Sequence, residues 1–227
     1  MSDLDNKQDE MPLVAHLIEL RTRLVHMIGA TLLVFFVLVA FRNDLYTLLA
    51  APLRQLLPVG SSMVATDITS SFLAPFKLTF FVSFFIAIPY VLYQVWSFIA
   101  PALYKHEKKL AIPLLVSSVI LFYIGISFAY FVTLGPVLKF FVSVAPENVD
   151  FMTDINAYLD FCIKFFLVFG FTFEIPVVVL ILIMAGIIST ESLAEKRRYI
   201  IVICFAISMF VTPPDALSMT VLAVLMW

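Results

Sequence analysis

Glycine is scarce in this chain, with six residues among 227, and none of them forms a GxxxxGK phosphate loop. The chain is therefore not expected to hydrolyse ATP. It also lacks an HExxH motif, and its three histidines do not pair at the spacing of a zinc site. A GxSxG nucleophile elbow is missing as well. These absences predict a protein that is not an enzyme and that holds no metal and no cofactor.

Charge and cysteine are also in short supply. Only 13% of the residues are charged and the formal net charge is −2, which does not suit a nucleic-acid-binding surface. The two cysteines, Cys162 and Cys204, lie far apart inside apolar segments and form no CxxC pair. We expect both to pack as small core hydrophobes.

Apolar residues are abundant. They make up 63% of the chain, and 24 of them are Phe, against about 45–50% apolar residues in soluble domains. The mean hydropathy of +1.07 indicates a polytopic membrane protein, with residues 1–227 in a single domain and 1–23 as a cytoplasmic, amphipathic N-terminus. Uncharged runs, compared with the ~20 residues that cross a bilayer, predict six spanning helices. The expected spans are residues 24–41, 78–103, 110–135, 160–186, 199–212 and 216–227, the last one incomplete.

Basic residues predict the orientation of these spans, because Lys and Arg accumulate in cytoplasmic loops. Three lysines lie within residues 105–109, and residues 196–198 are all basic. We therefore expect these two loops and the N-terminus to be cytoplasmic, and residues 42–77 and 139–157 to be extracytoplasmic.

Prolines recur inside the expected spans, where each removes a backbone hydrogen bond and bends or ends a helix. They predict a bent bundle with a concave face, rather than a straight one. Pro52 is expected to bend an interfacial helix that follows the first span. The prolines of the spans are Pro89, Pro101, Pro113, Pro136 and Pro176.

Two acids lie in the expected cytoplasmic segments. Glu19 precedes Arg23 by four residues in an amphipathic segment, so an ion pair within one helix is the simple interpretation. The alternative is that Glu19 accepts a cation from another molecule. Glu107 lies among lysines between the second and third spans, where it either belongs to a solvated basic loop or is a second acceptor.

Glu174 lies inside the apolar stretch FGFTFEIPVVVLILIM. A charged side chain at the bilayer centre costs roughly 2.5–3.5 kcal/mol on insertion scales. The acid is therefore either neutral and hydrogen-bonded to a neighbouring helix, or part of a hydrated path or site. We expect it on the concave face of the bundle, because Pro176 frees a backbone carbonyl nearby. Asp215 follows two prolines, a pattern typical of a turn or a helix cap.

Six motifs in this order resemble the TatC family, the large multi-span subunit of the bacterial twin-arginine protein translocase. The resemblance covers essentially the whole chain and is strongest to gammaproteobacterial members. The motifs are HLIELRTRL, APLRQLLP, YQVWSFIAPALYKHEKK, FEIP, KRRY and TPPDALS.

The resemblance implies an all-α, glove-like bundle of six helices in the bacterial inner membrane, with a cytoplasmic N-terminus. It implies that Glu19 and Glu107, with Arg21 and Phe98, bind the twin-arginine signal peptides of folded cargo proteins. An arginine guanidinium group suits this role because it pairs with a carboxylate through two parallel hydrogen bonds, which lysine cannot match.

The resemblance also implies partners and further functional positions. The family works with TatA and TatB, small single-span subunits, in a complex of several copies that draws on the proton motive force. The residues expected to act in transport or partner contact are Glu174, Asp215, Pro52, Met209 and Thr212.

A different class of function is also compatible with the residues alone. A proton-coupled transporter of small solutes would use broken helices and a membrane acid, with Glu174 as its proton site. No internal repeat supports it, and it leaves the acids at the cytoplasmic face without a role.

Overall fold

The chain is a multi-pass membrane protein built from apolar helices. The computed structural model describes residues 2–56, 63–65, 67, 69–99, 111–144, 153–184, 186–211 and 216–226. Within this part of the chain there is no strand, and the only β-type pairing is an isolated bridge between Val64 and Asp154. Four helical stretches are long and apolar enough to cross a membrane: Val14–Arg54, Phe72–Phe98, Ile112–Val144 and Ile155–Met184.

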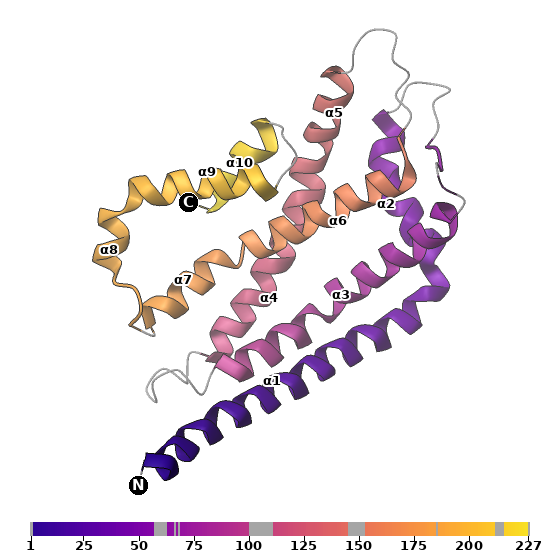
Figure 1. Cartoon of the computed structure of the whole chain (residues 1–227). Helices are drawn as coiled ribbons and strands as arrows, with labels where there is room; N and C mark the ends of the chain where they lie inside the picture. The colour runs from indigo at the N-terminus through magenta and orange to yellow at the C-terminus, as the bar shows by residue number, and fades with distance from the viewer. Residues whose placement is uncertain are drawn as a thin grey trace.

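The helices follow one another with few breaks (Figure 1). The first half contains α1 (Ser2–Leu38), a 3-10 turn (Val39–Phe41), α2 (Arg42–Leu56) and α3 (Ser70–Ile99). The next stretch contains α4 (Ala111–Phe128), a π-helical turn (Ala129–Thr133) and α5 (Leu134–Val144). The second half contains α6 (Ile155–Thr172), α7 (Ile175–Met184), α8 (Thr190–Glu195), α9 (Arg197–Val211) and α10 (Ala216–Met226).

These helices extend beyond several of the expected spans, and α3, for example, begins at Ser70 instead of residue 78. The first span runs through the 3-10 turn directly into α2, the third continues past residue 135 to Val144, and the fourth begins at Ile155 instead of residue 160. Charged side chains near these ends, such as Lys139 and Asp160, lie at partly or fully exposed positions of the helices. An exposed charge on one face does not end a helix, because the opposite face still packs.

The core is centred on α6, which packs against α3, α4 and α10. Figure 1 shows α6, in orange, passing beside α3 and α4. Its buried face is largely aromatic, and the ring centroids of Phe165 and Phe169 lie 4.7 Å apart. Cys162 is fully buried in this face and Cys204 is buried in α9, which confirms that both are small core residues.

Proline breaks the fourth span as expected. α6 ends at Thr172, α7 begins at Ile175, and Phe173 and Glu174 form a turn between them. Pro176 lacks the amide hydrogen that would bond to the Thr172 carbonyl in a continuous helix. Pro136 follows the π-helical turn closely, and a π turn is one way in which a helix absorbs a lost backbone bond. The result is a bent bundle.

Two glycines let α4 and α6 approach each other closely. A Cβ atom added at Gly125 would lie 2.7 Å from the backbone carbonyl oxygen of Phe169. A Cβ atom at Gly170 would lie 2.7 Å from the ring of Phe122, which is fully buried. Small residues at such a crossing allow the dense packing that holds helices together in lipid.

We predict that Gly125→Ala lowers the free energy of unfolding by about 1–3 kcal/mol, because a backbone oxygen cannot move aside as a flexible side chain can. Gly29→Ala is the matched control, since nothing lies within 4 Å of the added Cβ atom. It should be neutral or stabilising by up to about 1 kcal/mol through its higher helix propensity. SDS-induced unfolding in mixed micelles measures both, and equal effects of the two substitutions would contradict this packing.

Candidate functional site

The carboxylate of Glu19 is held in a fixed position on α1. Arg23, one turn later, donates to Glu19 Oε1 from Nε at 2.9 Å and from Nη2 at 2.6 Å. The predicted ion pair is therefore confirmed. It uses only one of the two carboxylate oxygens, and 39% of the Glu19 side chain is exposed.

Arg23 also ties α1 to α3. Its Nη1 donates to Gln94 Oε1 at 3.1 Å and its Nη2 to the backbone carbonyl of Ser97 at 3.2 Å. Gln94 is only 7% exposed, and its amide donates in turn to the Tyr90 hydroxyl at 2.8 Å. Because buried polar groups need partners in an apolar bundle, this network fixes Arg23, and Arg23 fixes Glu19.

His16 completes the site from the other side. Its ring stacks on Phe98 with centroids 4.2 Å apart and an interplanar angle of 20°. Its Nδ1 lies 3.9 Å from Glu19 Oε2, beyond hydrogen-bond distance. Glu19 Oε2 therefore accepts no hydrogen bond from the part of the chain that the structure describes. This oxygen is open to a donor from another molecule.

The structure thus brings together two of the four residues expected to bind a signal peptide, Glu19 and Phe98, with His16 between them. Arg21 lies on α1 close to Glu19 and is exposed. Glu107 lies outside the described residues, in the segment that starts after Ile99, one residue beyond Phe98. The segment that contains Glu107 therefore leaves α3 next to Phe98, on which His16 stacks.

Glu174 lies apart from this site, in the turn between α6 and α7. It is 9% exposed and its Oε1 is buried with no hydrogen-bond partner among the described residues. Its carboxyl group interacts with the Ser118 side chain of α4, and the Ser118 hydroxyl accepts from Trp96 Nε1 of α3 at 3.4 Å. Glu174 thus faces the interior of the bundle.

The remaining expected positions are dispersed. Pro52 lies inside α2 on the face where Leu49 and Leu53 are buried, and Tyr158 donates to the Leu49 carbonyl at 3.0 Å. Met209 is exposed on α9. Thr212 and Asp215 lie outside the described residues. The two described positions, Pro52 and Met209, lie on different helices.

The sequence did not single out Gln94 or the stacking of His16 on Phe98. A hint was present, because an amide in the otherwise apolar run that ends α3 must find a partner. Which helix supplies that partner depends on the register of α1 against α3, which periodicity alone does not reveal. Among the described residues no cluster of three potential metal ligands occurs. The site is a carboxylate held by one arginine, which in turn donates to the side-chain amide of Gln94 and the backbone carbonyl of Ser97.

Comparison with known proteins finds matches to one protein family. Residues 15–224 match the model of TatC, described as Sec-independent protein translocase protein (TatC). A protein of that name from Azotobacter chroococcum mcd 1 is 55% identical, covering 98% of this chain and 87% of its own length. The one from Escherichia coli K12 is 51% identical, covering 97% and 85%. A crystal structure titled as the twin arginine translocase receptor TatC superposes with a TM-score of 0.78 at 37% identity and covers 93% of each chain.

We predict that Arg23 and Gln94 are energetically coupled. In a double-mutant cycle of Arg23→Met and Gln94→Leu, a hydrogen bond to a charged group should give a coupling of about 1 kcal/mol in the free energy of unfolding. The matched control pairs Gln94→Leu with Arg21→Met, because Arg21 forms no hydrogen bond with the described residues, and should be additive. Additivity in both cycles would show that the link between α1 and α3 carries no energy.

Proposed function

The chain belongs to the TatC family, and we propose that it is the receptor subunit of a twin-arginine protein translocase. It binds the signal peptides of folded cargo proteins at the cytoplasmic face and nucleates the translocation complex. Its role is non-catalytic: it supplies binding and positioning, not covalent chemistry. The observation that carries this proposal is the open oxygen of the Glu19 carboxylate, held at a partly exposed position by Arg23.

The geometry of Glu19 favours a guanidinium ligand. Arg23 occupies Oε1, so an incoming donor meets Oε2, next to the aromatic surface of His16 and Phe98. A guanidinium group is planar, stacks on aromatic faces and stays charged, whereas an ammonium group is a strongly hydrated point charge. The site therefore discriminates arginine from lysine by stacking as well as by charge.

A second acid is needed because a twin-arginine signal peptide contains two adjacent arginines. We assign it to Glu107, in the segment that follows Ile99, and we assign Arg21 and Phe98 to signal-peptide binding as well. Two charge-assisted hydrogen bonds contribute roughly 1.5–3 kcal/mol each, whereas one exposed ion pair contributes about 0–1 kcal/mol. Recognition of both arginines together thus binds more tightly than either contact alone.

The orientation that follows is the one that basic residues favour. The N-terminus and the loops at residues 104–109 and 187–198 lie in the cytoplasm, and the membrane is the bacterial inner membrane. The partners are TatA and TatB, in a complex with several copies of each subunit that uses the proton motive force. Pro52, Met209, Thr212 and Asp215 are assigned to transport or to contacts with these partners.

Glu174 acts during transport, after the signal peptide has been recognised at Glu19 and Glu107. Its interior position and unpaired Oε1 support a contact with a polar group of a partner helix or of the inserting signal peptide. Burying a polar oxygen without a partner costs roughly 1–3 kcal/mol, so a ligand that satisfies it gains that energy on insertion. First recognition at Glu19 and Glu107 does not require it.

We predict that Glu19→Ala and Glu107→Ala each weaken binding of a twin-arginine peptide about tenfold, with the larger loss for Glu107, because each removes one charge-assisted contact. Fluorescence anisotropy with the purified protein in detergent measures this. Glu195→Ala, which removes an exposed acid of α8, is the matched control and should leave the affinity unchanged. Unaltered binding in both single mutants and in the double mutant would remove the assignment.

We predict a separate phenotype for Glu174. Glu174→Gln should keep much of the transport of a folded cargo, because an amide still forms hydrogen bonds, and Glu174→Ala should lose more. Both variants should bind the twin-arginine peptide with normal affinity. Transport assays in inverted membrane vesicles test this. If Gln were as inactive as Ala, a proton site of the kind found in solute transporters would be favoured instead.

A further inference from the structure

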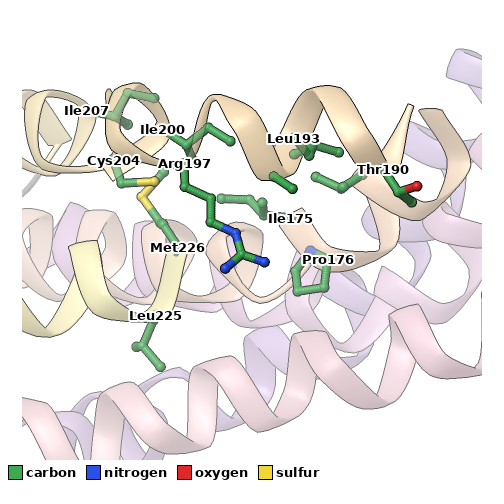
Figure 2. Close-up of a pocket in the computed structure, with 12 residues that line it drawn as sticks. Ile175, Pro176, Thr190, Leu193, Arg197, Ile200, Cys204, Ile207, Leu225 and Met226 are labelled. Atoms are coloured by element: carbon green, nitrogen blue, oxygen red, sulfur yellow. The ribbon is translucent and has the colours of Figure 1, made fainter. Parts of the chain in front are cut away.

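A cavity of about 750 Å³ lies between α7, α8, α9 and α10, away from Glu19 (Figure 2). Its walls are aliphatic for the most part, with Ile175 and Pro176 from α7 and Leu225 and Met226 from α10 among the lining residues. The volume of this cavity falls within the range of about 300–1,000 Å³ that is typical of small-molecule binding sites.

Among the described residues that line this cavity, Arg197 is the only charged one. Figure 2 shows its side chain extending from α9 toward Pro176 of α7. The guanidinium group forms no hydrogen bond or ion pair with the described residues. Its neighbour Arg198 behaves differently, because it lies over the ring of Tyr199 at 5.1 Å and does not line the cavity.

Arg197 is an exposed cation at one end of an apolar groove, so an anionic group placed there forms a charge-assisted pair with it. The occupant should therefore carry a negative charge at one end. The rest of the occupant should be apolar, because the side chains that follow Arg197 on the same face of α9 are Ile200, Cys204 and Ile207. This stripe descends over about 15 Å at 1.5 Å per residue, about half of a ~30 Å hydrocarbon core.

We propose that this cavity binds an anionic phospholipid of the cytoplasmic leaflet, with its phosphate on Arg197 and an acyl chain along Ile200, Cys204 and Ile207. Charge complementarity and the length of the stripe both fit such a molecule. The lipid would hold α9 and α10 at a set distance from α7, next to the turn that carries Glu174.

Native mass spectrometry of the full-length protein tests the proposal with phosphatidylglycerol and phosphatidylcholine of identical acyl chains. The unmodified protein should retain phosphatidylglycerol in preference. Arg197→Gln should lower the affinity for phosphatidylglycerol about tenfold, as expected for one charge-assisted contact, and abolish the preference. Arg198→Gln, the matched control from the same basic run, should change neither.

A second variant probes the apolar part of the site. Ile207→Trp fills the cavity without altering charge, and it should reduce the binding of both lipids while the circular dichroism spectrum and the melting temperature confirm folding. Excess inorganic phosphate should not displace the lipid, because the acyl chain contributes to binding.

Three results would overturn the proposal. Equal losses in Arg197→Gln and Arg198→Gln would indicate general surface attraction and no built site. Displacement by inorganic phosphate alone would indicate a simple anion site. A photoreactive residue at position 207 that captured only polypeptide in native membranes would assign the cavity to a protein helix.

Discussion

The guanidinium group of Arg23 holds the N-terminal helix to the bundle and orients the acid of the candidate site at the same time. One planar cation contacts Glu19 on its own helix and Gln94 and Ser97 on α3. α1 otherwise presents many apolar side chains outward, such as Leu33 and Phe36, as expected of a surface that faces lipid. Without a hydrophobic driving force between helices in lipid, polar links of this kind fix the register.

The same constraint accounts for how polar residues are distributed in the bundle. Ser83 and Thr79 are fully buried and donate to backbone carbonyls one turn earlier in α3. Gln94 pairs with Arg23 and Tyr90. Not every buried group is satisfied: among the described residues, the side-chain hydroxyls of Thr133 and Thr153 and Oε1 of Glu174 have no hydrogen-bond partner. Oε2 of Glu19 accepts no hydrogen bond from the described residues either, but its side chain is partly exposed. In the function proposed above, Glu19 acts in first recognition and Glu174 in insertion.

Much of the helical architecture could be predicted from the sequence, because hydropathy reports directly on what a bilayer requires. The break at Glu174 was also predictable, since Pro176 removes a specific backbone bond. Helix ends were less predictable, because the third helical stretch continues past the expected end at residue 135 to Val144, and the fourth begins at Ile155, before residue 160. The Glu19–Arg23 pair followed from spacing, whereas its anchorage to Gln94 and the stack of His16 on Phe98 depend on how α1 docks on α3. Such contacts between distant segments leave no periodic trace in a single sequence.

Site-specific photo-crosslinking tests the central claim most directly. A photoreactive amino acid placed at position 16 or 98 of the full-length protein in membranes should capture a twin-arginine signal peptide. The same residue at position 33, on the lipid-facing side of α1, should not. Capture at positions 16 and 98 should disappear with a twin-lysine peptide. Equal capture of both peptides, or capture at position 33 alone, would contradict recognition of arginine at Glu19.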